Sequence, residues 1–353
     1  MKRIRWLLAL AGAMLLAYFL FWPSPIEPVA WQPPPSPEWS GPYAANRGLS
    51  GIKILPEMGP GPESVAATSD GWLYTGLQDG RVVRMRADGT RLETFARTGG
   101  RPLGLQFDAR GNLIVADAFR GLLSISPDGK LTVLADQVEG ERMLFVNDLA
   151  IAADGAIWFS DSSRRFDQHH WIFDFWEARP TGRLLRYDRA SGKASVVLDR
   201  LMFSNGVALG PGDEFVLVAE TLAARITRHW LRGPKAGQTD SFVPALPGYP
   251  DNVTYDGRGV FWVALPSPRV PALERMAGLP WLRRALFHIP AEIRDPKPGR
   301  MAWVLGLDTE GRVVRSLQDP SGAYGPVTSV LAFGGKLYFG SIETTAIGWV
   351  PAP

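Results

Sequence analysis

The chain contains no cysteine, so neither disulfide bonds nor thiol chemistry contribute to its fold or function. It also lacks a Gly-x-Ser-x-Gly nucleophile elbow, a phosphate-binding glycine-rich loop with lysine, and a His-Glu-x-x-His zinc helix. These absences argue against serine-hydrolase, nucleotide-binding and zinc-protease chemistry. The formal net charge is only +3, and the basic residues are scattered, so no nucleic-acid partner is predicted.

The chain is instead rich in turn-forming and aromatic residues, with 38 glycines, 30 prolines and 13 tryptophans among 353 residues. A sequence pattern recurs in which an opening residue is followed by apolar residues two and four places later and then by a turn. This alternation predicts a half-buried strand that ends in a hairpin. Four copies open on carboxylate or amide residues and two on other residues: Glu63, Asn147-Asp148, Asn205, Asp251-Asn252, Leu103 and Thr328.

Six such units at a period of roughly 40 to 55 residues predict an all-β fold, a six-bladed β-propeller. The opening residues would stand at the starts of the innermost strands and converge on the mouth of the central channel. The apolar stretch at residues 52–55 precedes the first unit. We expect it to pair with the last blade and close the ring, which removes an exposed sheet edge.

Carboxylate and amide oxygens at one register predict a site for a hard cation, because zinc and copper usually recruit imidazole or thiolate. Calcium is the predicted cofactor, as one ion at the central channel, with another divalent metal as the alternative. The predicted ligands are Glu63, Asn147, Asn205, Asp251 and Asn252. A single Asn or Asp at such a place often only caps a strand or turn, but four units with the same pattern favour a shared metal site.

Residues 6–22 form an uninterrupted apolar run after Lys2, Arg3 and Arg5. This pattern predicts a membrane anchor over residues 1–22 with a cytoplasmic N-terminus, and the alternative is a cleaved secretory signal. Residues 23–50 are proline-rich and predict an extended spacer, followed by the propeller at 51–353. We therefore expect a single-pass membrane protein whose propeller is exported to a periplasm, a lumen or the cell exterior.

Two insertions interrupt the repeat. Residues 166–178 are aromatic and include His169 and His170, which are interpreted either as a pocket wall with a proton shuttle or as a packed loop. Residues 271–287 have leucines at helical spacing with arginines between them, which predicts a lid, a membrane-touching helix or simple packing onto the propeller. Both insertions favour a hydrophobic substrate.

Three segments carry a resemblance to a known family: GRLLRY at 182–187, NGVAL at 205–209 and GYPDN at 248–252. They resemble the strictosidine synthase-like family, and the match extends across residues 50–350. That family is similar to the six-bladed calcium propellers that include the paraoxonases and the senescence marker protein/gluconolactonases, and to adipocyte plasma membrane-associated protein, which has an N-terminal anchor. The resemblance implies calcium bound by Glu63, Asn147-Asp148, Asn205 and Asp251-Asn252.

Two departures from these relatives bear on activity. Strictosidine synthase uses a glutamate near the start of the last blade, where this chain has Thr328, so its Pictet-Spengler condensation is the least favoured reading. Paraoxonases place a histidine in an early blade, where this chain has the apolar residues 102–104. A histidine-dependent copy of their mechanism is not expected.

The predicted function is calcium-dependent hydrolysis of lactones or aryl esters, in which the metal polarises the carbonyl. Asp251, or Asp148 next to the site, is the predicted catalytic base that takes a proton from water. The alternative is a non-catalytic, membrane-anchored calcium propeller that binds a protein or a small ligand. An enzyme needs an open coordination position, whereas a structural ion would be enclosed by protein ligands.

Overall fold

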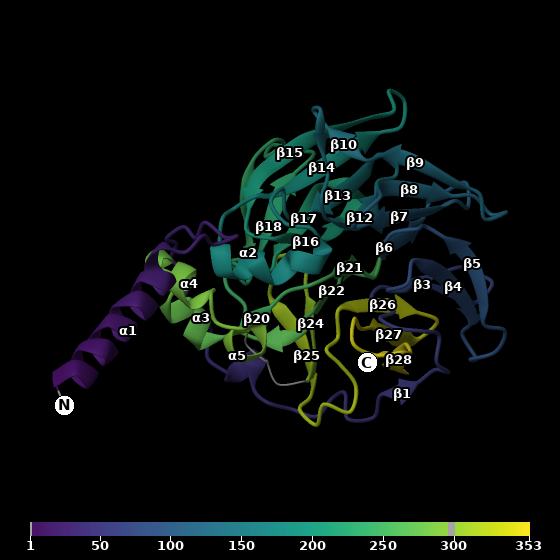
Figure 1. Ribbon diagram of the computed structural model, residues 1–353. Helices are drawn as coiled ribbons and strands as arrows, with labels where there is room; N and C mark the ends of the chain where they lie inside the picture. The colour runs from purple at the N-terminus through teal and green to yellow at the C-terminus, as the bar shows by residue number, and fades with distance from the viewer. Residues whose placement is uncertain (1, 296–300) are drawn as a thin grey trace. The chain divides into compact units, whose positions relative to one another are not determined.

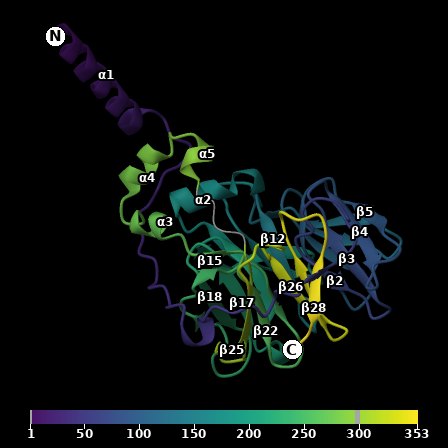
Figure 2. The same cartoon turned by 90° about the horizontal axis from the view of Figure 1, so that it is seen from below.

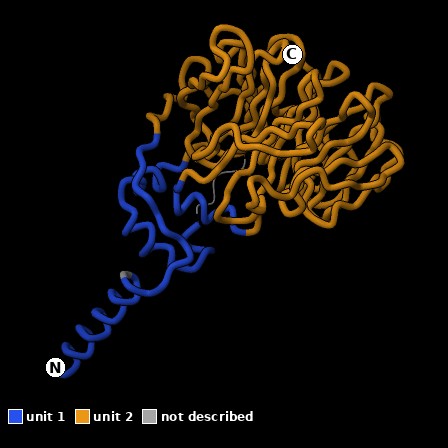
Figure 3. The backbone as a smooth tube through the Cα atoms, turned by 90° about the horizontal axis from the view of Figure 1, so that it is seen from above, with its two compact units in different colours: residues 1–33, 170–179, 270–298 blue, residues 34–169, 180–269, 299–353 orange. Residues whose placement is uncertain are grey.

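The computed structural model describes residues 2–295 and 301–353 of the chain. Its contacts divide the chain into two compact units, which are coloured separately in Figure 3. Residues 34–169, 180–269 and 299–353 make up the first, called here the propeller unit. Residues 1–33, 170–179 and 270–298 make up the second, called here the helical unit.

The propeller unit consists of six four-stranded antiparallel sheets, which Figure 1 shows arranged around a common centre. The first sheet contains β2 (Ala66–Ala67), β3 (Trp72–Gly76), β4 (Arg81–Arg86) and β5 (Glu93–Arg97). The second contains β6 (Pro102–Phe107), β7 (Leu113–Asp117), β8 (Gly121–Ile125) and β9 (Leu131–Ala135). The third contains β12 (Val146–Ile151), β13 (Ile157–Asp161), β14 (Gly182–Asp188) and β15 (Lys193–Leu201).

The remaining sheets follow the same order along the chain. The fourth contains β16 (Ser204–Leu209), β17 (Phe215–Glu220), β18 (Arg225–Trp230) and β19 (Thr239–Val243). The fifth contains β21 (Val253–Tyr255), β22 (Phe261–Ala264), β24 (Ala302–Leu307) and β25 (Val313–Asp319). The sixth contains β26 (Ser329–Phe333), β27 (Lys336–Gly340), β28 (Gly348–Pro351) and β1 (Lys53–Ile54).

Short elements complete this unit. Strand β10 (Gln137–Val138) pairs with β11 (Glu141–Arg142), and β20 (Gly248–Tyr249) pairs with β23 (Ser267–Pro268). Single turns of 3-10 helix occur at η1 (Gly41–Tyr43) and η3 (Pro211–Asp213).

The six-bladed β-propeller predicted from the repeats is confirmed. The first strands of neighbouring sheets contact one another, for example β6 with β12 and β16 with β21, so these strands line the centre. The ring closes where Lys53 pairs with Trp349 and Ile54 pairs with Gly348. Residues from the two ends of the propeller sequence therefore share one sheet, which leaves the ring no unpaired blade edge at its joint.

The hydrophobic core lies between adjacent sheets, because each blade buries one face against the next. Phe261 and Trp303 of the fifth sheet, for example, are fully buried against Phe215 and Ala219 of the fourth. Strands β17, β22 and β24 are buried along their whole length and carry consecutive apolar residues, as expected for strands that are covered on both faces. Burial between blades fixes the register of every strand and so fixes where each strand begins.

The structure divides the N-terminal region differently from the predicted boundaries. Residues 34–50 belong to the propeller unit rather than to a free spacer. Asn46 Oδ1 accepts a hydrogen bond from the Gln318 backbone N–H at 2.9 Å, and Leu49 is fully buried. The 3-10 turn η1 in this segment contacts the edge strand β25.

The helical unit brings together three distant segments of sequence. It contains α1 (Lys2–Phe21), α2 (Trp171–Glu177), α3 (Pro271–Arg275), α4 (Pro280–Leu286) and α5 (Ala291–Arg294), and the 3-10 turn η2 (Gln168–His170) leads into it. Helix α4 contacts both α1 and α2, and Figures 1 and 2 both show the short helices grouped together. Phe287 packs edge-on against Phe173 at 4.8 Å between ring centroids, which joins the two insertions.

Helix α1 occupies the segment for which the sequence predicts a membrane anchor. Its first turns include Lys2, Arg3 and Arg5, so they are charged rather than apolar. Within residues 2–295 and 301–353, no helix combines the length and the apolar character needed to cross a membrane. The predicted single-pass topology is therefore not confirmed.

Arg283 ties the three segments of the helical unit to one another. Its guanidinium is 1% exposed and donates hydrogen bonds to the backbone carbonyls of Val29, Trp176 and Ala277. Burial lowers the pKa of Arg283 to about 10, while the charge of Glu177 opposes this shift, so the group remains charged at neutral pH. One side chain thus satisfies carbonyl groups from all three segments.

Replacing Arg283 with methionine is expected to destabilise the helical unit by roughly 2 kcal/mol, because several buried carbonyls lose their donor. The measurement is amide hydrogen exchange within residues 270–295, which should become faster while exchange in the propeller strands stays unchanged. Arg284, an exposed neighbour on the same helix, provides the matched control as Arg284→Met. Equal exchange rates in the two variants would contradict this role for Arg283.

Candidate metal centre

The predicted ligands lie where the innermost strands begin and depart from regular pairing. The register of β12 against β13 shifts between Val146 and Leu149, and that of β16 against β17 shifts between Ser204 and Val207. The candidate asparagines of both strands fall inside these shifts. A bulge takes side chains out of the regular alternation and directs them to a new place, so these residues need not follow the inward and outward pattern of a strand.

Four buried oxygen atoms of the predicted ligands have no hydrogen-bond partner among the described residues. They are Glu63 Oε2, Asn147 Oδ1, Asn205 Oδ1 and Asn252 Oδ1. The four side chains are each at most 5% exposed. Because an unpaired buried acceptor costs about 1–3 kcal/mol, four within one ligand set indicate a site that binds an electropositive group.

The amide nitrogens explain why the amide oxygens are left free. Asn252 Nδ2 donates to Glu63 Oε1 at 2.9 Å, and Asn147 Nδ2 donates to Ser162 Oγ at 3.0 Å. Ser162 in turn donates to the backbone carbonyl of Ser204 at 2.7 Å. These bonds fix the orientation of both amides. In each amide the nitrogen faces its hydrogen-bond acceptor, so the oxygen points the other way.

Three carboxyl groups influence one another at this site. Burial raises the pKa of Glu63 to about 7 and that of Asp148 to about 8. Burial and the charges of Glu63 and Asp148 raise the pKa of Asp251 well above its ordinary value, although a hydrogen bond from Asn205 opposes the shift. The site therefore disfavours three negative charges unless a cation compensates for them.

Asp148 also connects two blades. Its Oδ2 accepts a hydrogen bond from the Val207 backbone N–H on the neighbouring innermost strand at 2.9 Å. An added Cβ on Gly104 would lie 2.4 Å from Asp148 Oδ1. The absence of a side chain at residue 104 therefore leaves room for the Asp148 carboxyl, a role that the sequence pattern did not reveal.

Arg101 is a charged neighbour of the site that the repeat did not identify. Its side chain is 2% exposed and donates from Nη1 to the backbone carbonyl of Gly61 at 2.9 Å. Its charge lowers the pKa of Glu63 against the larger effect of burial. Because Arg101 lies two places before the second unit's opening residue, no pattern of opening residues would have located it.

The carboxyl groups do not form a metal cluster by themselves. Within residues 2–295 and 301–353, no group of three or more His, Cys, Asp or Glu side chains is placed to hold a metal. Any hard cation here would need the amide oxygens as well, and such mixed oxygen coordination suits calcium. Two cavities of the propeller unit, of about 440 and 280 Å³, include none of the predicted ligands.

The histidines of the first insertion make aromatic contacts. His169 stacks on Phe119 with 4.6 Å between ring centroids, and His170 meets Phe173 edge-on at 5.1 Å. Both histidines are nonetheless exposed to solvent. The proton-shuttle role stays a prediction.

Comparison with known proteins gives the chain a family. The Strictosidine synthase model matches residues 147–234, and the Strictosidine synthase-like, N-terminal model matches residues 41–85. Protein strictosidine synthase-like 13 of Arabidopsis thaliana is 38% identical over 326 residues, which covers 83% of this chain and 78% of that protein. The chain belongs to the strictosidine synthase-like family.

Two further comparisons extend this result. The human (Homo sapiens) adipocyte plasma membrane-associated protein is 36% identical to this strictosidine synthase-like protein over 360 residues, covering 95% of this chain and 85% of that protein. A gluconolactonase from Xanthomonas campestris has a structure with a TM-score of 0.63 at 19% identity, covering 94% of this chain and 99% of that one. At that identity the likeness establishes a shared propeller fold.

In this strictosidine synthase-like protein, Thr328 stands where the resemblance to strictosidine synthase implies a glutamate. Its side chain is fully buried, and Oγ1 donates to the backbone carbonyl of Glu63 at 2.8 Å. Thr328 thus connects the last blade to the first beside a predicted ligand. It supplies no carboxylate at that position.

Replacing Gly206 with alanine is expected to cost roughly 1–3 kcal/mol of stability and to weaken cation binding. An added Cβ would lie 2.4 Å from Val253 N and 2.5 Å from Asp251 O, and these backbone atoms cannot rotate away as a side chain would. The segment that carries two predicted ligands must therefore shift. Thermal unfolding with calcium and with chelator measures both effects.

Gly51→Ala is the matched control, because an added Cβ there meets nothing within 4 Å and its φ is not positive. If Gly206→Ala matched that control in melting temperature and in its response to calcium, the close approach of Gly206 to the backbone of residues 251–253 would be unimportant for the site.

Proposed function

We propose that this protein is a calcium-dependent hydrolase of lactones or aryl esters. The observation that carries the proposal is the set of unpaired, buried oxygens on Glu63, Asn147, Asn205 and Asn252. Carboxylate and amide oxygens are the ligands that calcium prefers, and buried carboxylates with raised pKa values gain most from a nearby cation. A shared propeller fold with a gluconolactonase supports the choice of reaction class.

Glu63, Asn147, Asn205, Asp251 and Asn252 would hold the calcium ion. Bound there, the ion would polarise the substrate carbonyl and stabilise the negative charge that develops on its oxygen. The side chains position the ligands and the neighbouring strand. The amide nitrogens keep the ligand oxygens oriented, and Asp148 holds the neighbouring strand in place through Val207.

Asp251 is the proposed catalytic base. It is half-buried, whereas Asp148 is buried and its Oδ2 already accepts a backbone hydrogen bond. A carboxylate beside the ion, with one oxygen outside the coordination, can take a proton from water. The substrate class is a hydrophobic ester or lactone, which the aromatic insertion at 166–178 favours.

The low exposure of four of the ligands favours a second candidate function. In that case calcium only stabilises the ring, and the protein is a non-catalytic propeller that binds a protein or a small ligand. The two functions share the same ion and the same ligands. They differ in whether a substrate reaches the ion.

The test uses the full chain in detergent, with gluconolactone, a long-chain γ-lactone and phenyl acetate as substrates. Turnover in calcium that chelator abolishes and that calcium restores is the expected result. Calcium binding by calorimetry without turnover of any substrate would favour the binding propeller. Absence of calcium binding would show that the predicted ligands do not form a metal site.

We also propose that the protein associates with a membrane through α1. The helix exposes large apolar side chains, including Trp6, Leu8 and Leu15, after a basic start. A relative with 36% identity is named adipocyte plasma membrane-associated protein.

The expressed full chain should sediment with membranes, and a Leu8→Arg, Leu15→Arg double variant should not. Alkaline carbonate would release a surface-bound protein but not a spanning one, and wild-type protein in the soluble fraction would overturn the association.

A further inference from the structure

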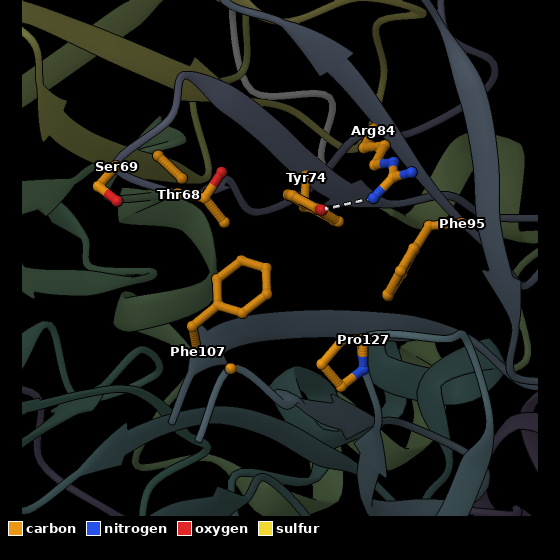
Figure 4. Close-up of a pocket in the computed structure, with 9 residues that line it drawn as sticks. Thr68, Ser69, Tyr74, Arg84, Phe95, Phe107 and Pro127 are labelled. Carbon is orange, nitrogen blue, oxygen red and sulfur yellow. Dashed lines mark hydrogen bonds between the residues drawn. The ribbon is translucent and has the colours of Figure 1, made fainter. Parts of the chain in front are cut away.

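A cavity of about 440 Å³ lies between the first and second sheets of the propeller unit, at a place the proposed function does not use. Figure 4 shows the rings of Tyr74, Phe95 and Phe107 around this space, with the side chain of Arg84 above it. Cavities of about 300–1,000 Å³ with apolar walls and a few polar groups are typical of small-molecule sites. None of the predicted calcium ligands lines this one.

The aromatic walls stand nearly at right angles to one another. The Tyr74 ring meets Phe95 at 5.2 Å and 90°, and it meets Phe107 at 4.9 Å and 79°. Edge-to-face and offset arrangements are the favoured contacts between aromatic rings. A planar aromatic ligand in this space would find both ring faces and ring edges available for such contacts.

Arg84 supplies the polar end of the cavity. Its Nη1 donates to the Tyr74 hydroxyl at 3.0 Å, and its Nε pairs with Glu93 at 2.5 Å. Among the described residues, Nη2 of Arg84 has no hydrogen-bond partner. A guanidinium with unused N–H groups is suited to a planar carboxylate.

The charge of Arg84 decides which kind of ligand the aromatic walls select. Aromatic rings at right angles also suit organic cations. The Arg84 guanidinium, however, already lies 5.2 Å from the Phe95 ring centroid and 5.9 Å from that of Tyr74. A second cation would be repelled, whereas an anion would be attracted.

We propose that this cavity binds a small aromatic carboxylate, with the ring between Phe95 and Phe107 and the carboxylate on Arg84. Glu93 competes for the same guanidinium, and its side chain is 48% exposed. Removing the Glu93 charge therefore strengthens binding of the carboxylate. Binding at this site does not require calcium, because no predicted calcium ligand takes part.

The experiment is calorimetric titration of the full chain with 2-naphthoate and with 2-naphthamide, its neutral analogue, in the presence of chelator. The wild-type protein is expected to prefer the carboxylate. Glu93→Gln should raise affinity for naphthoate by about two- to fivefold, because an exposed ion pair is worth little, and should leave naphthamide unchanged. Arg84→Met should remove the preference, and Phe107→Ala should weaken both ligands.

The gain expected for Glu93→Gln cannot arise from misfolding, which keeps the test decisive if Arg84→Met proves unstable. Absence of binding to either compound would overturn the proposal. So would naphthoate binding that appears only with calcium, since that would place the ligand at the metal centre. Affinities unaffected by both Glu93→Gln and Phe107→Ala would place it elsewhere on the surface.

Discussion

Replacing Glu63 with glutamine is expected to lower calcium affinity by at least about 100-fold, because even indirect partners of metal ligands change affinity about 10- to 100-fold. Among the described residues of the ligand set, Glu63 Oε2 is the unpaired oxygen that carries negative charge. Because the variant binds calcium so weakly, its rate of lactone hydrolysis should fall to the uncatalysed background. Glutamine keeps the size of the side chain and can still accept the hydrogen bond from Asn252 Nδ2. Calorimetry with calcium chloride and a lactone assay on the same preparation measure both losses.

The stability of this variant provides an independent control. In chelator, Glu63→Gln should melt at or above the wild-type temperature, because the amide removes a buried charge that Arg101 and the hydrogen bond from Asn252 compensate only in part. In calcium, only the wild-type protein should gain stability. Glu310→Gln, at an exposed glutamate of the same unit, should behave as wild type in both conditions. If calcium raised the melting temperature of the Glu63 variant as much as that of the wild type, Glu63 would not be a ligand.

Replacing Asp251 with asparagine is expected to reduce turnover at saturating calcium by about 10²- to 10⁴-fold, the usual contribution of a general base. The amide keeps an oxygen for the ion but cannot take a proton from water. Calcium affinity should fall as well, since a negative ligand is lost, so turnover must be measured after the site is filled. The measurement is kcat for the best lactone of the panel over a range of calcium concentrations.

Asp148→Asn is the matched comparison, because this residue has a similarly raised pKa but already accepts the Val207 N–H. In chelator this variant should melt at or above the wild-type temperature, because burial already disfavours the charge of Asp148 and an amide oxygen can still accept the Val207 N–H, and its turnover should fall less than that of Asp251→Asn. If Asp148→Asn abolished turnover while Asp251→Asn did not, the two residues would exchange roles. Full turnover in both variants would place the base elsewhere.

The repeat in the sequence was sufficient to predict the architecture. Alternation with a period of two residues, a turn at a fixed distance and six recurrences are local features, and each blade forms from residues close together in sequence. The same reasoning located the closing strand at residues 52–55 and the opening residues of the innermost strands. The sequence also predicts the type of chemistry, because oxygen ligands without histidine or cysteine indicate a hard cation.

The sequence did not determine which oxygens are free. That depends on the bulges in β12 and β16, and on hydrogen bonds such as those from Asn252 to Glu63 across the ring. Partners 189 residues apart have no common local pattern. The contribution of Arg101 and the close approach at Gly104 were hidden for the same reason, since each depends on a neighbouring blade.

Only the tertiary structure brought the N-terminal segment and the two insertions into one unit. Each insertion is a short helical interruption in the repeat, and its apolar or aromatic residues do not indicate which segment they pack against. Arg283 supplies the connection through backbone carbonyls of segments more than 100 residues away, such as that of Trp176. Backbone carbonyls are present at every residue, so the sequence marks no preferred acceptor for a buried guanidinium. The sequence by itself determined the repeating strands and the oxygen-rich site, because these depend on local periodicity and side-chain chemistry, whereas long-range contacts decided the orientation of the ligands and the assembly of the helical unit.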